Sequence, residues 1–189
     1  MKKTFTIDVP EGEKRVLVHA CCAPCSGAIL EALIRCGISP TVFFSNSNIT
    51  PFGEYSHRLS ELLRYARELG LEVVEDDYYH EEWLQGVSGL ENEPERGARC
   101  LRCFSLRLDR AARYASEHGF RVLTTTLASS RWKDLSQVDA AGREACARYP
   151  GVIWWGMNWR KGGLQDRRNE IIREQGFYNQ TFCGCEFSR

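Results

Sequence analysis

Cysteines in tight groups are the residues of this 189-residue chain whose type and spacing could do chemistry. One run, His-Ala-Cys-Cys-Ala-Pro-Cys, carries three of them, and two pairs stand far from it in the sequence. Thiolates that converge from distant segments are typical of metal–sulfur centres, which only folding completes. The three groups are Cys21, Cys22 and Cys25; Cys100 and Cys103; and Cys183 and Cys185.

These seven thiols leave three interpretations open: an iron–sulfur centre, a structural zinc site, or thiol–disulfide chemistry. A tetrahedral zinc site needs only four cysteines, so the surplus favours a cluster with a second metal, or a cluster with a redox pair. Cys36 and Cys146 stand alone in helical stretches and are interpreted as small buried hydrophobic residues. The odd total of nine cysteines argues against a framework made only of disulfides.

The composition is that of a soluble globular protein of one domain, with 43% hydrophobic and 26% charged residues. Lysine plus arginine equals aspartate plus glutamate at 25 each, so any nucleic-acid contact must depend on a local basic patch. No apolar run approaches the roughly 18 residues that span a bilayer, and no apolar secretory segment follows Lys2 and Lys3. We therefore expect a cytoplasmic protein without a membrane partner, in which clustered thiols bind metals rather than pair as disulfides.

Strands that alternate with amphipathic helices must position these thiols. The alternation predicts a single α/β domain with a Rossmann-like (HUP-like) parallel sheet flanked by helices. We expect an irregular insertion near residues 78–99, with a short helix around 81–86, and a basic tail, 158–189, that folds back onto the metal site. The expected strands are residues 15–19, 41–45, 71–75, 121–126 and 151–155, and the expected helices are residues 26–36, 53–69, 100–118, 135–149 and 164–175.

The first thiol group lies between the strand at 15–19 and the helix that follows. This is the edge of the sheet where α/β proteins hold their ligands. A turn after the strand can aim both Cys21 and Cys22 inward, which a regular strand cannot do with adjacent residues. Cys25 is expected near the positive end of the helix dipole, which favours its thiolate form.

Several motifs of other function classes are absent. The sequence has no G-x-G-x-x-G fingerprint for a dinucleotide and no G-x-x-x-x-G-K-[ST] phosphate loop. Cys21 and Cys25 have C-x-x-x-C spacing, but Ala28 stands where the C-x-x-x-C-x-x-C triplet of radical enzymes needs its third cysteine. The thiols are therefore the strongest functional signal in the sequence.

Basic and aromatic residues leave further alternatives open. Trp154, Trp155 and Trp159 could form a stacking surface for a base or could pack in the core. His19 is expected to be a buried imidazole that supports the site rather than a metal ligand. A run of arginines could be a solvated helix face or a phosphate-binding face beside a metal site. Its members are Arg96, Arg99, Arg102, Arg107, Arg110 and Arg113.

Four segments resemble the QueH-type epoxyqueuosine reductases. They are the Cys-Cys-Ala-Pro-Cys run, N-x-N-I-x-P-x-x-E-Y-x-x-R from Asn46, R-C-x-x-C-F from Arg99, and Tyr-Asn-Gln-Thr-Phe-Cys-Gly-Cys from Tyr178. The resemblance spans nearly the whole chain. It implies reduction of epoxyqueuosine to queuosine at the wobble position of tRNA, the last step of queuosine biosynthesis, without cobalamin.

The resemblance also implies a 4Fe-4S cluster beside a mononuclear iron, and an external electron donor such as ferredoxin or flavodoxin. Some members carry aspartate where this chain has Cys25. Residues 128–133 lack the Ser-Pro-Tyr run of many members, and Asn158 stands where aspartate is common, so substrate contacts are where this chain departs from the family. By position, the cluster ligands would be Cys21, Cys22, Cys100 and Cys103, and the ligands of the second iron would be Cys25, Cys183 and Cys185.

The sequence leaves the proton donor and two competing functions open. Lys133, Glu54, Tyr55 and Tyr178 are all candidate proton donors. One competing function is a zinc-stabilised RNA-binding module without catalysis. The other is a sulfur-transferring or adenylating tRNA enzyme, against which stands the missing phosphate loop.

Overall fold

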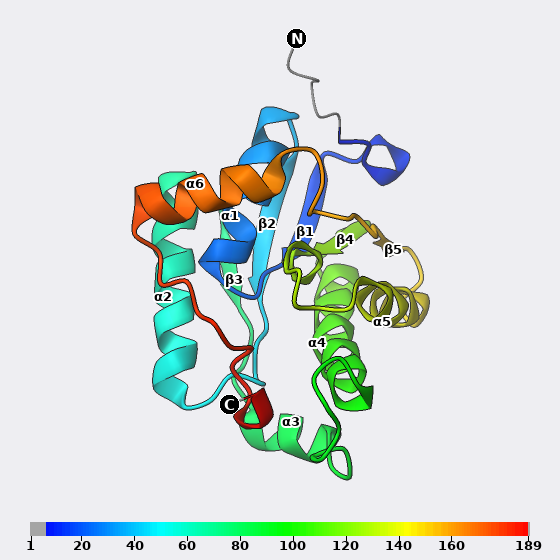
Figure 1. Cartoon of the computed structure of the whole chain (residues 1–189). Coiled ribbons are helices and arrows are strands. Elements are labelled where there is room, and N and C mark those ends of the chain that lie inside the picture. Colours follow the sequence, from blue (N-terminus) through cyan, green and yellow to red (C-terminus); the bar gives the residue numbers. More distant parts are fainter. Residues whose placement is uncertain (1–6, 189) are drawn as a thin grey trace.

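Five parallel strands form the centre of the computed structural model, which describes residues 7–188. Their order across the sheet is β3-β2-β1-β4-β5, and every neighbouring pair runs parallel (Figure 1). The predicted Rossmann-like α/β domain is confirmed. The strands are β1 (Arg15–His19), β2 (Ser39–Phe44), β3 (Val73–Glu75), β4 (Val122–Thr125) and β5 (Ile153–Trp154).

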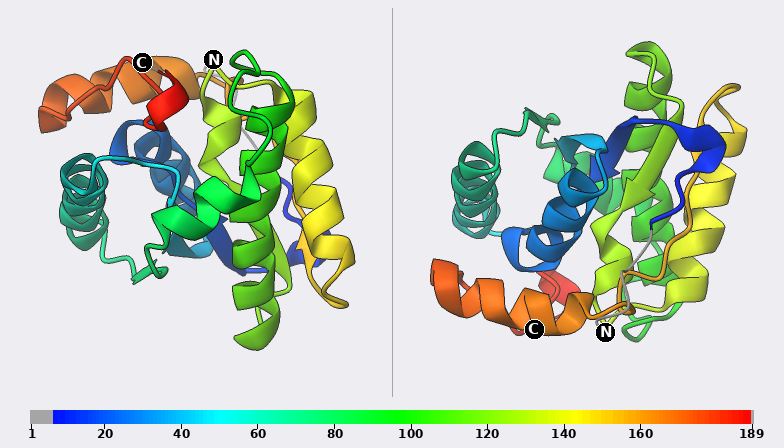
Figure 2. Two further views of the ribbon diagram at one scale, coloured as in Figure 1. Left: turned by 90° about the horizontal axis from the view of Figure 1, so that it is seen from below. Right: turned by 90° about the horizontal axis from the view of Figure 1, so that it is seen from above.

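Within residues 7–188, six α-helices accompany the sheet. Helices α1, α2 and α6 pack together on one side, and α4 and α5 pack together on the other (Figure 2). No helix in this part of the chain is long and apolar enough to cross a membrane. The helices are α1 (Ala23–Arg35), α2 (Phe52–Glu68), α3 (His80–Gly86), α4 (Ala98–Glu117), α5 (Leu135–Ala147) and α6 (Leu164–Gln175), with short 3-10 turns η1 (Pro10–Gly12), η2 (Thr126–Ser129) and η3 (Glu186–Ser188).

The strand order reverses at β1, and this reversal positions the site. Val16, Leu17 and Val18 are fully buried because helices cover both faces of the sheet at β1. The crossovers leave β1 and β4 in opposite directions along the sheet, so a crevice opens at their carboxyl ends. The segments that begin after His19 and Thr125 therefore face each other across this crevice.

Helix α1 begins three residues earlier than the sequence predicts, at Ala23 instead of Ser26. Cys22 has an extended backbone and is the N-cap, and Pro24 lies in the first turn, where its missing N–H leaves no hydrogen bond unmade. The earlier start places Cys25 inside the first turn of the helix.

The tryptophans near β5 pack in the core and do not form an open stacking surface. Trp159 is fully buried and its indole N–H donates to the hydroxyl of Thr124 at 3.3 Å. Trp155 is buried against it, with the ring planes at 79°. Trp154 is partly buried and donates to Asp139 at 3.1 Å.

An ion pair joins helix α6 to helix α1. Arg167 donates through two nitrogens to both carboxylate oxygens of Glu31, each at 2.8 Å, and Tyr65 of α2 donates to the same carboxylate at 2.9 Å. These contacts, led by the Arg167 hydrogen bonds, hold the pKa of Glu31 below its usual value. The carboxylate therefore links the three helices of this face.

Glu31→Gln should lower the free energy of unfolding at pH 7 by about 1 kcal/mol, because it removes this bidentate pair. A carboxyl whose pKa is lowered by folding stabilises the protein above its unfolded pKa. The difference between parent and variant should therefore begin to shrink as the pH falls below about 4, and should be lost as the pH falls through the lowered pKa of folded Glu31. Urea denaturation at several pH values measures it. Glu117→Gln, which breaks an exposed pair with Arg113, is the control and should change little; an equal loss in both variants would contradict this role of Glu31.

Candidate metal centre and adjoining cavity

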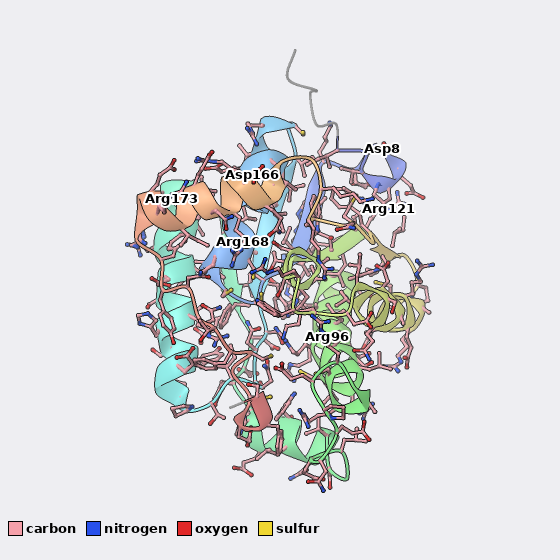
Figure 3. The ribbon with its side chains drawn as sticks, viewed as in Figure 1. Asp8, Arg96, Arg121, Asp166, Arg168 and Arg173 are labelled. Carbon is pink, nitrogen blue, oxygen red and sulfur yellow. The ribbon has the colours of Figure 1, made fainter. Side chains whose placement is uncertain are left out.

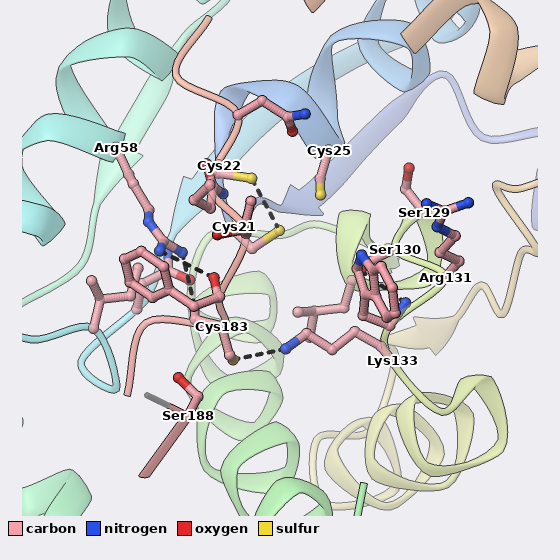
Figure 4. Close-up of a pocket in the computed structure, with 18 of the residues that line it drawn as sticks. Cys21, Cys22, Cys25, Arg58, Ser129, Ser130, Arg131, Lys133, Cys183 and Ser188 are labelled. Atoms are coloured by element: carbon pink, nitrogen blue, oxygen red, sulfur yellow. Dashed lines mark hydrogen bonds between the residues drawn. The ribbon is translucent and has the colours of Figure 1, made fainter. Parts of the chain in front are cut away.

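The turn after β1 brings three thiols together. The sulfur atoms of Cys21, Cys22 and Cys25 all lie within 4.8 Å of one another, and those of Cys21 and Cys22 are 3.8 Å apart (Figure 4). Because the chain leaves the strand at Ala20 and caps α1 at Cys22, adjacent cysteines can turn to the same side, as the sequence predicts. This is a group that could hold a metal ion.

Hydrogen bonds among these sulfurs favour the thiolate form of Cys21 over that of its neighbours. Hydrogen bonds from the thiols of Cys22 and Cys25 hold the pKa of Cys21 well below its usual value, and the Thr126 hydroxyl and the Arg107 cation add to the effect. The same contact with Cys21 raises the pKa of Cys22 to about 12. A bound cation would release the remaining protons, since thiolates are the form that binds metals.

Cys183 of the tail lines the same cavity as this turn. The ammonium of Lys133 donates to the sulfur of Cys183 at 2.7 Å (Figure 4). The pKa of Cys183 is well below its usual value, first because the thiol of Cys185 donates to it and then because Lys133 lies beside it. Burial alone would lower the pKa of Lys133, but the thiolate of Cys183 more than offsets that effect and raises it.

The cysteines of α4 go to different places. Cys103 is buried beside Cys185 in a small cluster with Trp83 and Val87. Cys100 is half-buried, and its sulfur accepts a hydrogen bond from the backbone N–H of Arg96 at 3.3 Å. In the described part of the chain, Cys100 does not join the group of three around Cys21.

A buried arginine holds the tail in place. Arg58 of α2, 4% exposed, donates to the carbonyl of Cys183 at 2.8 Å and to that of Phe182 at 3.4 Å. Its charge is balanced by Glu54 one turn earlier, at 2.6 Å. Gly184, between the tail cysteines, has a φ of 119°, and a side chain there would also meet the Arg58 guanidinium at 3.2 Å.

Two of the candidate proton donors, Glu54 and Tyr55, bind other residues of the chain. Neither residue lines the cavity. The carboxylate of Glu54 is taken up by Arg58, and Tyr55 is 1% exposed and donates to Glu75 at 3.0 Å. The i, i+4 spacing of Glu54 and Arg58 was the sequence signal for an ion pair within one helix. Tyr178 also lies outside the cavity lining, whereas Lys133 is part of it.

Several arginines of α4 bind other residues of the chain, so the run does not form one open phosphate-binding face, although Arg102 and Arg113 are exposed. Arg107 is 3% exposed and donates to the carbonyl of Ser45 at 3.2 Å and to the side chain of Asn46. Arg110 binds Asp76, and buried Arg99 binds backbone carbonyls of the insertion, including Glu91 at 2.9 Å. The charge of Arg107 instead lowers the pKa values of Cys21 and Cys183.

His19 is a fully buried imidazole, as expected. Its ring nitrogens bond to the hydroxyl of Thr125 at 2.8 Å and the carbonyl of Ser45 at 3.0 Å. Burial, followed by the charge of Arg107, lowers its pKa to about 4, so the ring stays neutral. His19 therefore ties together the ends of β1, β2 and β4 that frame the crevice.

The thiols open onto a cavity of about 550 Å³. Asn48 lies in its wall, 1% exposed, and its side-chain oxygen has no hydrogen-bond partner among the described residues. A buried polar atom without a partner is costly, so this wall suits a polar ligand. Sequence reasoning did not assign several other lining residues to the site, among them Ser129, Arg131, Trp132 and Arg168.

The parallel sheet and the crevice thiols define an α/β protein with a cysteine cluster able to hold a metal at the reversal of strand order. A family model described as Epoxyqueuosine reductase QueH matches residues 16–189. The chain belongs to this family, which confirms the resemblance seen in its motifs and its oxidoreductase class.

Relatives that carry the same name cover most of the chain. The epoxyqueuosine reductase QueH of Haemophilus influenzae is 44% identical over 182 residues, which are 96% of this chain and 74% of that protein. The one from Acinetobacter baylyi is 41% identical over 187 residues, 99% of this chain and 86% of the relative. The one from Thermotoga maritima is 34% identical over 176 residues, 92% and 89% of the two chains.

Arg58→Gln should free the tail cysteines, because glutamine cannot reach two carbonyls and carry the charge that Glu54 neutralises. In metal-free protein, alkylation of Cys183, followed by mass spectrometry, should become several-fold faster, while alkylation of Cys146 stays slow. Arg67→Gln, at an exposed position of the same helix, is the matched control. Equal labelling rates in parent and Arg58→Gln would show that Arg58 does not hold the tail.

Proposed function

We propose that this chain reduces epoxyqueuosine to queuosine at the wobble position of tRNA, with a 4Fe-4S cluster and an adjacent mononuclear iron. The observation that carries the proposal is the gathering of thiols from the turn after β1 and from the tail around one polar cavity, with Cys103 of α4 buried beside tail residue Cys185, in a chain of this family. We place the reaction in the cytoplasm, with ferredoxin or flavodoxin as the electron donor.

The donor set fits an iron–sulfur centre. Its ligands would be thiolates, and the cations of Arg107 and Lys133 lie close enough to lower the pKa values of the buried thiols. We assign the cluster to Cys21, Cys22, Cys100 and Cys103, and the second iron to Cys25, Cys183 and Cys185. Contacts of the metal-free protein cross this division, since Cys25 lies with Cys21 and Cys103 with Cys185. Both metals would therefore occupy neighbouring parts of one centre.

Opening the epoxide to the alkene takes two electrons and two protons and releases water. When bound, the metals would supply electrons and a Lewis-acidic iron for the epoxide oxygen. The chain supplies the rest. The ammonium of Lys133 lies at the cavity wall, 2.7 Å from the sulfur of Cys183. It is the proton donor that the geometry favours. Asn48 offers an unpaired carbonyl oxygen to an N–H or O–H of the modified base.

Purification without oxygen tests the function. We expect a brown protein that contains iron and sulfide and that, once chemically reduced, converts epoxyqueuosine in tRNA to queuosine, as detected by mass spectrometry of the nucleosides. Removal of the metal with a chelator should abolish conversion. A colourless protein that contains zinc and binds RNA would support the zinc-stabilised module instead, and a requirement for ATP would support an adenylating enzyme.

Two cysteine substitutions test which cysteines hold the cluster and which hold the second iron. Cys100→Ala should prevent cluster assembly, because it leaves an incomplete shell of four thiolates. Cys183→Ser should retain most of the visible absorbance and lose turnover, because only the iron that would bind the epoxide oxygen is affected. Iron content, visible spectra and single-turnover reduction are the measurements.

Cys36→Ala and Cys146→Ala are the matched controls and should keep full iron. Each should change stability by only about 1 kcal/mol. Loss of the whole cluster in Cys183→Ser would make the tail cysteine a cluster ligand. Unchanged iron in Cys100→Ala would remove that residue from the centre.

A further inference from the structure

A tryptophan at the cavity is left mostly exposed to solvent. Trp132 is 68% exposed, the highest value among the large hydrophobic side chains of residues 7–188, and it lines the cavity together with Lys133. An indole left in water forgoes burial of roughly 150–250 Å² of surface. Exposure of this size beside a functional cavity points to a ligand that covers the ring.

The loop that carries Trp132 is held firmly between η2 and α5. Arg96 donates to the carbonyls of Trp132 and Arg131, each at 3.0 Å. Arg160 donates to the carbonyls of Ser130 at 2.6 Å and Lys133 at 2.7 Å. Two arginines from other segments thus fix the backbone on both sides of Trp132. The backbone of this residue is therefore positioned without a ligand.

Arg96 also connects this loop to the metal centre. Its backbone is in the left-handed region, with a φ of 64°, which is uncommon for a residue other than glycine. Its backbone N–H donates to the sulfur of Cys100 at 3.3 Å while its guanidinium binds the loop. Arg96 therefore joins the backbone of the loop that carries the indole to the sulfur of Cys100.

The surroundings of the ring are basic although the chain as a whole has no net charge. The guanidinium of Arg131 lies 5.1 Å from the centre of the Trp132 ring. Arg168 of α6 lines the same cavity, and Figure 3 shows Arg96 and Arg168 on the same face of the molecule. An aromatic ring beside one cation, on a cavity lined by a second, is an arrangement that can bind a stacked base next to its phosphates.

From this geometry we propose that Trp132 stacks on a nucleotide that flanks the modified base in the anticodon loop, with Arg131 and Arg168 facing the adjacent phosphates. The proposal rests on the proposed function. A cavity that receives one base takes it out of the stack, and the neighbouring base loses a stacking partner. The exposed indole would replace that partner, which makes Trp132 a positioning residue for the RNA and not a residue of the chemistry.

Two substrates distinguish a role of Trp132 in positioning the RNA from a role in the chemistry. They are the epoxyqueuosine nucleoside and an anticodon stem-loop that contains it. With chemical reductant, Trp132→Ala should lower kcat/KM for the stem-loop by roughly 5- to 100-fold, the range for one lost base stack, mainly through KM. Turnover of the nucleoside, which has no flanking base, should stay at the parent value. Trp132→Phe should recover most of the loss, and Phe52→Ala, at another exposed aromatic residue outside the cavity, should change neither substrate.

Other outcomes overturn the proposal in distinguishable ways. Equal losses for both substrates would place Trp132 in the chemistry or in folding, and unchanged stem-loop kinetics would show that the ring has no RNA contact. A loss seen only with a protein electron donor would make the ring part of a docking surface for that donor. If the parent reduces neither substrate, the proposed function fails. Fluorescence anisotropy of a labelled stem-loop then still decides whether Trp132→Ala weakens RNA binding.

Discussion

The pairing of cysteine sulfurs with the cations beside them is the interaction on which the rest of this structure depends. A sulfur anion withdrawn from water without a counter-charge is strongly disfavoured, so the half-buried Cys21 and Cys183 favour the thiolate form only where positive charge lies close by. Arg107 lowers the pKa of both, and Lys133 donates to Cys183 at 2.7 Å. Because these groups come from β1, α4, the loop before α5 and the tail, the centre forms only when the whole chain has folded.

Arginines that bind pairs of carbonyls hold the irregular segments around this centre. Loops carry carbonyls that no strand or helix satisfies, and one guanidinium has five donors in a fixed plane. Arg58 binds two carbonyls of the tail, and Arg96 and Arg160 each bind two in residues 130–133. A chain rich in arginine but without net charge thus uses several of these residues to position its own backbone.

Sequence reasoning predicted the elements and the thiol groups better than the polar contacts between them. Apolar runs and cysteine spacing are properties of residues close together in the sequence, so β1 and the turn at Cys21 could be predicted. The direction of a long side chain depends on tertiary contacts. Arg107 alternates with apolar residues on α4 like a solvated residue, yet it points inward, and Glu54 faces Arg58 instead of the cavity. Trp132 lies in a segment without periodicity, so only the folded chain shows its exposure.

The central claim is that the thiol centre and the substrate cavity are one site. Electron paramagnetic resonance of the anaerobically purified, chemically reduced protein tests it most directly, with an anticodon stem-loop containing epoxyqueuosine added stepwise and an unmodified stem-loop as control. We expect the signal of the reduced cluster to shift and saturate with the modified RNA and to change less with the unmodified one. A signal unaffected by either RNA, under conditions where both are shown to bind, would contradict the claim that the metals lie beside the base.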